Sequence, residues 1–430
     1  MFPSIRYPAL LFALIAPSAW AQSEAGQTKD LAISGARIEV GNGTVIPHGN
    51  VIVHNGKISA VGENAAIPAG ATVVDGTGLT VYPGFIDAYA TDGLKLPEQP
   101  SYGTPPDSRN TAPPTMWHGN RKGIRSDILA AKCLDVKGEL TGNFAQGVTT
   151  ALLAPGNGTI RGTAAVVDYT PTGNTLSPAA GVEISFRSGS GQGYPGTLFG
   201  IIANLRQVLA DAQYACAQEP KVKEAALENL RPLVTQQIPC FFDADSAREI
   251  VRANRVADEF NFKMILVGGK EAYRDLDLIK AKKESVIVNV DPGFEPSLKP
   301  ETEVGSAPLA VLKERHQTWV EHTENAKKLA DAGVPFAFTA GSGMGDFLKN
   351  IRKVIATGVS KDAALHALTG GAAEILGVSD KVGTIETGKF ANLVLMTGDF
   401  ADDKSEVQSV VVEGSQVQVK KPAVKETAKK

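Results

Sequence analysis

The middle of the chain alternates between short apolar strands and amphipathic helices, and this alternation limits the possible folds. Strands are predicted at residues 148–154, 239–244, 262–267, 286–290 and 335–339. Helices are predicted at 197–212, 246–260, 272–283 and 308–332. Strands that return about every 25 residues with a helix between them indicate parallel β/α units of an α/β protein. We expect a closed (β/α)₈ TIM-like barrel, and a doubly wound open sheet is the alternative.

Both ends of this region are rich in residues that alternate with a period of two. Asn55-Gly56 separates two short strands within residues 51–62, and Glu413-Gly414 separates two strands near the other end. These dipeptides are typical of tight hairpin turns. We expect one small composite β-sandwich built from residues 22–82 and 382–419, around a barrel of residues 83–381. The lysine-rich tail at 420–430 is expected to be disordered.

The first 21 residues resemble a signal peptide. A short positive region precedes the apolar residues 9–16, and Ala19-Trp20-Ala21 forms a cleavage pattern. The apolar run is too short to span a bilayer. We expect cleavage after Ala21 and export to the periplasm or beyond, and the alternative is a buried N-terminal helix.

Charge and cysteine content exclude several classes of protein. The 43 basic and 46 acidic side chains give a net charge of −3, which offers no basic surface for nucleic acid. No transmembrane helix is predicted. Cys133, Cys216 and Cys240 fit no metal-binding knuckle, and their odd number leaves at least one unpaired. Buried thiols are favoured over a single disulfide.

Candidate site residues follow the predicted strands, because barrel enzymes carry their chemistry at the carboxyl ends of strands. The stretch from Val81 to Gly93, VYPGFIDAYATDG, places Asp87, Tyr89 and Thr91 after the first strand. Tyr89 and Thr91 are two residues apart, so both are expected on one face.

Carboxylates supply the only predicted metal ligands. Asp87, Asp243 and Asp291 could bind Mg²⁺ or Ca²⁺ through oxygen. An aspartate after a strand also often caps the next helix, and Asp245 beside Ser246 fits that role. A nitrogen-ligated Zn or Fe site is not expected, because the histidines lie away from strand ends. They are His48, His54, His118, His316, His322 and His366.

Two glycine-rich stretches, residues 156–162 and 189–196, are interpreted as tight loops. Neither ends in the Lys-Ser/Thr of a phosphate-binding loop. Arg161 and Arg187 could bind an anionic ligand there, although solvated surface arginines are the commoner case. The sequence contains no arrangement typical of a Ser/His/Asp or Cys/His nucleophile.

The chain resembles the amidohydrolase superfamily, and most closely its imidazolonepropionase-like exported branch. The resemblance is carried by VYPGFID at 81–87, QGVTT at 146–150, LHALTGGAAEILG at 365–377 and VGTIETGKFANLVL at 382–395. It implies a metal-dependent barrel with a composite β-sandwich. It also implies hydrolysis of carbon–nitrogen bonds other than peptide bonds, with Zn, Fe or Mn as the divalent metal.

The resemblance also implies that the metal-ligand motifs are degenerate. The family's His-x-His falls on Tyr89 and Thr91, and its strand-five histidine falls on or beside Asp243. Its strand-six histidine falls at Gly268 and its strand-eight aspartate at Ala340. The bridging residue of strand four is not located by the sequence.

Three functions follow as hypotheses. The favoured one is a non-catalytic or partner-dependent member that lacks the metal and pairs with an active relative or with itself. The second is an active C–N hydrolase with an Asp-rich site, in which Asp243 and Asp87 are the catalytic acids. The third is an exported protein that binds a small molecule. The candidate ligand-binding residues are Tyr89, Thr91, Arg161 and Arg187.

Overall fold

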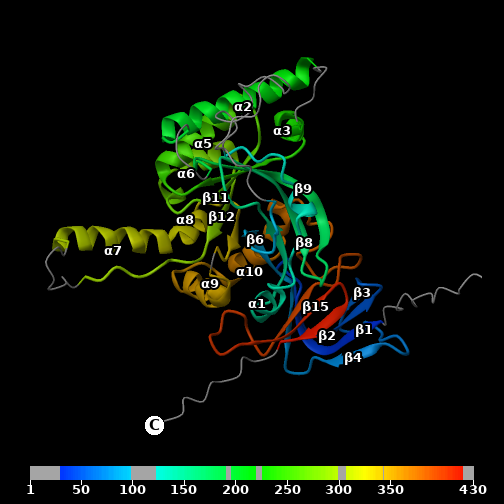
Figure 1. Cartoon of the computed structure of the whole chain (residues 1–430). Helices are drawn as coiled ribbons and strands as arrows, with labels where there is room; N and C mark the ends of the chain where they lie inside the picture. Colours follow the sequence, from blue (N-terminus) through cyan, green and yellow to red (C-terminus); the bar gives the residue numbers. More distant parts are fainter. Residues whose placement is uncertain are drawn as a thin grey trace, which may run out of the picture.

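Two eight-stranded sheets organise the protein (Figure 1). The computed structural model describes residues 30–97, 123–189, 195–218, 225–298, 307–341 and 343–419. The predicted signal peptide at 1–21, His118 and the tail at 420–430 lie outside the described residues. None of the described helices is long and apolar enough to cross a membrane.

One sheet forms a nearly closed barrel with the strand order β13-β12-β11-β10-β9-β8-β7-β6. Its strands are β6 (Phe85–Ala90), β7 (Val148–Leu153), β8 (Ile160–Asp168), β9 (Asn174–Ser185), β10 (Cys240–Ala244), β11 (Met264–Gly268), β12 (Ser285–Asn289) and β13 (Phe336–Thr339). The last strand returns to the first, where the Thr339 hydroxyl donates to the Tyr89 carbonyl. The TIM-like barrel prediction is therefore confirmed.

The barrel departs from a repeated β/α pattern at β7, β8 and β9. These strands pair antiparallel, and no helix separates them. The prediction of a glycine-rich loop at 156–162 is wrong from Ile160 onward, because β8 begins at that residue. Gly162 has φ +130°, and a Cβ there would lie 2.6 Å from the Ile128 carbonyl oxygen. The glycine thus permits a close backbone contact and a bulge inside a strand.

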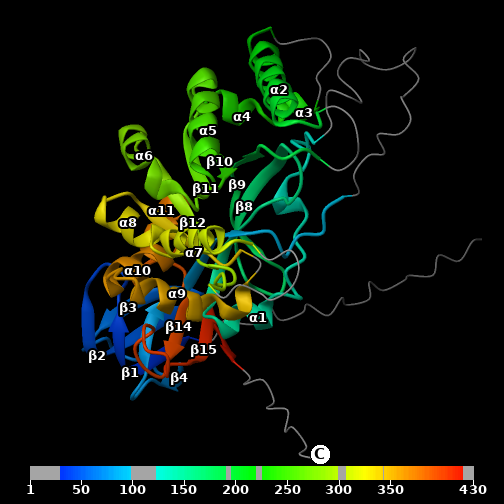
Figure 2. The same cartoon turned by 90° about the vertical axis from the view of Figure 1, so that its left-hand side faces the viewer.

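Helices cover the outside of the barrel (Figure 2). The longer ones are α2 (Leu198–Gln218), α5 (Ala247–Phe260), α7 (Leu309–Thr323), α9 (Phe347–Ala356) and α10 (Lys361–Leu368). The shorter ones are α1 (Leu140–Ala145), α3 (Ala225–Glu228), α4 (Arg231–Val234), α6 (Leu276–Lys282), α8 (Asn325–Asp331) and α11 (Gly370–Ile375). Ser246 and Glu249 form the predicted capping box of α5.

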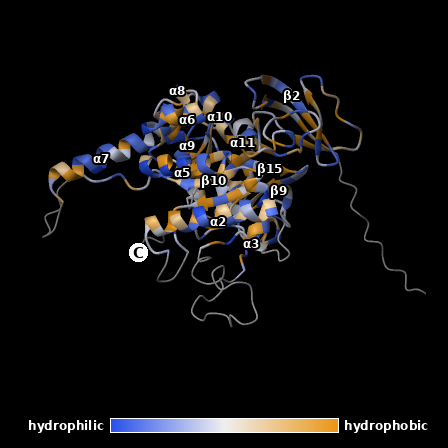
Figure 3. Ribbon diagram, turned by 90° about the horizontal axis from the view of Figure 1, so that it is seen from above, coloured by the Kyte–Doolittle hydropathy of each residue, from blue (hydrophilic) through white to orange (hydrophobic). Residues whose placement is uncertain are grey.

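The single helix predicted at 308–332 is two helices. α7 ends at Thr323 and α8 starts at Asn325, whose buried side chain donates to the Gly269 carbonyl and accepts from the Tyr273 amide. None of the α7 residues is buried. Figures 1 and 3 show α7 extending away from the barrel.

The second sheet combines strands from both ends of the chain, as predicted. Its strands are β1 (Leu31–Glu39), β2 (Val45–His54), β3 (Lys57–Gly62), β4 (Thr72–Asp75), β5 (Thr80–Pro83), β14 (Leu393–Met396), β15 (Val407–Val412) and β16 (Ser415–Gln418). β5 pairs with both β1 and β14, which joins the two parts. The hairpin turns have positive φ at Asn55-Gly56 and at Glu413-Gly414, as type I′ turns require.

All three cysteines are free thiols. Cys240 is buried in β10, whereas Cys133 and Cys216 are half-buried. The prediction of buried thiols is thus met in full only at Cys240.

Candidate functional site

Three of the predicted site residues meet at the barrel mouth. Arg161 of β8 donates through Nη1 to the Tyr89 hydroxyl at 2.8 Å and through Nη2 to Asp243 Oδ2 at 2.6 Å. Tyr89 comes from β6 and Asp243 from β10, so the guanidinium connects three strands of the sheet. This Tyr89–Arg161–Asp243 cluster is the polar centre of the candidate site.

Arg161 is buried, and the expectation of a solvated surface arginine is wrong for it. Only 7% of the residue is exposed, because β8 is buried along its whole length. Arg187 fits the surface expectation, since its side chain is 65% exposed. Its Nε still lies 3.6 Å from Asp243 Oδ2, so two guanidinium groups converge on one carboxylate. Both arginines approach the same oxygen of Asp243, and the buried Arg161 makes the shorter contact.

Glu183 is a site residue that sequence reasoning missed. It lies on β9 and is completely buried, and neither carboxylate oxygen has a hydrogen-bond partner among the described residues. Burial raises the pKa of Glu183 to about 8. The nearby Arg161 and Tyr89 both act in the opposite direction and lower it. The signal was an isolated acid in the apolar run GVEISF at 181–186, which could be recognised only if β9 had been predicted.

Asp87 is a second buried acid, but its surroundings differ. Its Oδ1 accepts from the Tyr89 amide at 3.1 Å, and its Oδ2 has no partner among the described residues. Burial raises the pKa of Asp87 to about 7, and the nearby carboxylate of Asp92 raises it further. Asp243 is bound by arginines instead, so the two predicted catalytic acids have different neighbours.

The other predicted residues lie outside the cluster. Thr91 does not share a face with Tyr89 as predicted, because β6 ends at Ala90 and the alternation of side chains ends with it. Thr91 is exposed, whereas Tyr89 is buried. Asp291 follows β12, where its Oδ1 accepts from the Gly293 amide at 2.9 Å. Asp245 is not the cap of α5, because Ser246 takes that position; Asp245 pairs with Lys270 at 3.5 Å instead.

The residues present do not fit the metal centre that the family resemblance implies. Gly268 and Ala340 have no side-chain donor atoms, and the Arg161 cation already occupies Asp243. Within the described ranges, no group of three or more His, Cys, Asp or Glu side chains could hold a metal ion. Asp87, Asp243 and Asp291 therefore do not form the oxygen-ligand site considered from the sequence.

The backbone at Gly268 also disfavours a histidine there. Gly268 has φ +86°, and a Cβ would lie 2.4 Å from Asp245 Oδ1. Any side chain would be strained by the left-handed backbone and would displace the Asp245 carboxylate. The local backbone therefore favours glycine at the position where the resemblance places the strand-six ligand.

Gly268→Ala is expected to lower the free energy of unfolding by about 2 kcal/mol, because it combines backbone strain with a steric clash. Urea unfolding followed by circular dichroism measures this change. Gly345→Ala is the matched control, since a Cβ there meets no atom within 4 Å. Equal stability of the two variants would contradict the steric argument.

Comparisons with known proteins agree with this fold. Residues 222–417 match the model of the Amidohydrolase family. The structure of an amidohydrolase from Thermotoga maritima is 23% identical with a TM-score of 0.71, over 90% of this chain and 99% of that one. No curated protein matches the chain.

Two further solved structures share the architecture at lower identity. A Xaa-Pro dipeptidase with bound methionine is 16% identical with a TM-score of 0.57, over 91% of this chain and all of that one. An adenosine deaminase from Xanthomonas campestris with bound zinc is 14% identical with a TM-score of 0.50, over 92% of this chain and 94% of that one. At these identities the likeness establishes the fold alone.

Proposed function

We propose that the chain is a member of the amidohydrolase superfamily that works without a metal centre and does not hydrolyse substrate itself. Its place in the superfamily is supported by the family-model match over residues 222–417. The observation that carries this proposal is the Arg161–Asp243 ion pair at the barrel mouth. A permanently charged guanidinium supplies positive charge at the carboxylate that would otherwise face a metal ion.

The chemistry of the superfamily explains why this arrangement argues against hydrolysis. A metal-dependent hydrolase needs a metal to lower the pKa of bound water and a carboxylate to accept its proton. The positions of two metal ligands hold Gly268 and Ala340, and two arginines hold the Asp243 carboxylate. A barrel built this way is suited to binding, either of a small molecule or of an active relative or second copy.

One observation favours the alternative of an active C–N hydrolase. Asp87 and Glu183 have pKa values raised to about 7 and about 8, and acids of this kind are frequent in catalytic sites. Their exposed fractions are 1% and 0%, so a substrate touches neither carboxylate without rearrangement of the barrel. The buried position of both acids therefore supports the non-catalytic proposal.

Elemental analysis tests the proposal directly. Protein purified without chelator or polyhistidine tag is expected to contain far less than one Zn, Fe or Mn per chain. EDTA is expected to leave the urea midpoint unchanged, and a panel of cyclic amides is expected to remain unhydrolysed. One or two metal ions per chain, together with turnover, would establish the active alternative.

Export belongs to the same proposal. The signal-peptide pattern supports a mature chain that works outside the cytoplasm, in the periplasm of a host with an outer membrane. Intact-mass analysis of the exported protein is expected to show Gln22 as the first residue. An exported chain that retains Met1 would refute cleavage at Ala21.

A further inference from the structure

A cavity of about 560 Å³ lies beside the barrel mouth, separate from the Tyr89–Arg161–Asp243 cluster. It is bounded by the ends of β11 and β12 and by α7, α8 and α9. Its apolar wall is formed by Val288, Val290, Ala326 and Val354. Val288 and Val290 pack in one hydrophobic core with residues of the surrounding helices, such as Ala326 and Val354. Ile287, the strand residue next to Val288, packs with Tyr89 in a different core. The cavity is therefore on the outer side of the sheet.

Two of the charged groups that line the cavity have no ion-pair partner among the described residues. Lys353 donates to Asn350 Oδ1 at 3.2 Å, and no carboxylate pairs with it in the described part of the chain. Asp291 accepts from a backbone amide, and no basic side chain pairs with it there. Lys270, which also lines the cavity, is paired with Asp245. The two uncompensated groups have opposite charges.

α7 contributes an aromatic wall with unused polar atoms. Trp319 and His322 line the cavity one turn apart. Trp319 Nε1 and His322 Nε2 are buried and have no hydrogen-bond partner within the described ranges. Burial lowers the pKa of His322, which favours its neutral imidazole. The indole therefore offers an apolar face and a donor without an acceptor.

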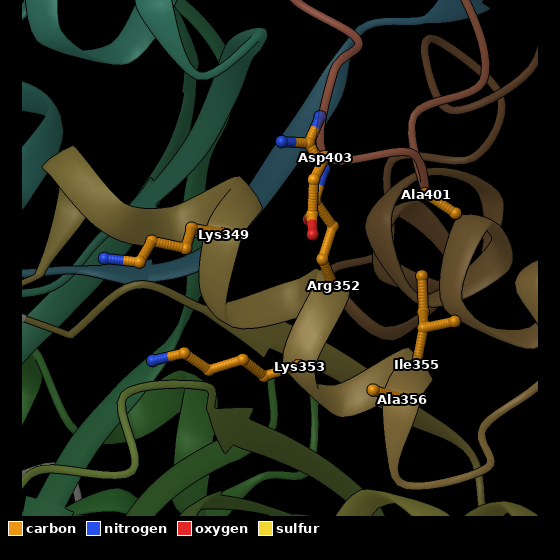
Figure 4. A pocket seen from close by; sticks show the side chains of 7 residues that line it. All are labelled: Lys349, Arg352, Lys353, Ile355, Ala356, Ala401 and Asp403. Atoms are coloured by element: carbon orange, nitrogen blue, oxygen red, sulfur yellow. The ribbon is translucent and has the colours of Figure 1, made fainter.

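Lys353 differs from its neighbour Lys349, although both extend in the same direction from α9 (Figure 4). Lys349 pairs with Asp346 at 3.3 Å and does not line this cavity. Both lysines also line a second hollow, the one drawn in Figure 4, together with Arg352, Ile355, Ala356, Ala401 and Asp403. Lys353 is thus the lysine of this pair that is available to a ligand in the cavity.

We propose that this cavity binds a small zwitterion with an apolar body, of the amino-acid class. Its carboxylate would pair with Lys353, its ammonium with Asp291, and its apolar part would lie against the valines and Trp319. A ligand with one charge leaves the other protein charge uncompensated, whereas a zwitterion pairs both. The cavity volume is in the range of small-molecule sites.

Isothermal titration calorimetry on the full chain tests the proposal with two probes. In L-phenylalanine the charges lie close together, and in 6-aminohexanoate they lie far apart. At least one of them is expected to bind. Its singly charged analogues are expected to bind about tenfold more weakly or not at all, because each loses one charge-assisted contact. The analogues are 3-phenylpropanoate and phenethylamine, or hexanoate and hexylamine.

Substitutions assign each end of the ligand. Lys353→Met is expected to weaken zwitterion binding about tenfold and to leave binding of the amine analogue unchanged. Asp291→Asn is expected to weaken zwitterion binding by a similar factor and to leave binding of the carboxylate analogue unchanged. Lys349→Met and Asp346→Asn are the matched controls and are expected to bind like the original chain.

Several outcomes would overturn the proposal. Absence of binding by both zwitterions would do so, and so would analogues that bind as tightly as the zwitterion. An equal effect of Lys349→Met and Lys353→Met would show that general surface charge is responsible. None of these outcomes depends on metal content or hydrolysis, so the proposed function and this site can fail separately.

Discussion

Replacing Arg161 with methionine is expected to lower the free energy of unfolding by about 3 kcal/mol, the usual cost of leaving one partner of a buried ion pair alone. The Arg161 and Asp243 side chains are only 8% and 18% exposed, so water compensates little of the loss. The Tyr89 hydroxyl loses its donor in the same variant. Urea unfolding at neutral pH measures the change in midpoint.

Arg187→Met is the matched control, because it removes a guanidinium from the same carboxylate. Its side chain is 65% exposed and lies 3.6 Å away, so the expected loss is below about 1 kcal/mol. Adding Asp243→Asn to Arg161→Met is expected to recover part of the lost stability, since neither charge of the buried pair then remains. Equal losses from Arg161→Met and Arg187→Met would show that the buried pair has no special structural role.

The general architecture was predictable because it depends on local patterns. Strand and helix periodicity between two β-rich ends led to the barrel, and the Asn55-Gly56 and Glu413-Gly414 dipeptides led to the hairpins. β8 and β9 were not predicted as strands, so the antiparallel run that they form with β7 was missed.

The candidate site was only half predictable for the same reason. Tyr89 and Asp243 follow strands that the sequence makes plain, and their place at the mouth follows from barrel geometry. Arg161 lies between glycines and was interpreted as part of a loop, although it belongs to a buried strand. Glu183 was missed with the strand that carries it. Burial of a charged residue depends on contacts between distant segments, which one sequence does not encode locally.

Glu183→Gln is expected to make the protein less sensitive to rising pH. Because burial raises the pKa of Glu183 to about 8, the folded protein holds a proton that the unfolded chain releases near pH 4.5. Stability from this group is fully present below the unfolded pKa and falls as pH rises toward 8. Glutamine stays neutral throughout, so the variant avoids this loss.

The expected measurement is a difference between two pH profiles of unfolding free energy. Relative to the original chain, Glu183→Gln should gain on the order of 3 kcal/mol between pH 5 and pH 9, since each unit of pKa shift corresponds to about 1.4 kcal/mol. The other buried acids with raised pKa values, Asp87, Asp168 and Glu284, remain in both proteins and cancel in the difference. Glu374→Gln, at an exposed position, is the control. Parallel profiles for Glu183→Gln and the original chain would mean that Glu183 is ionised in the fold, held by Arg161, and that the buried cluster is a network of fixed charges.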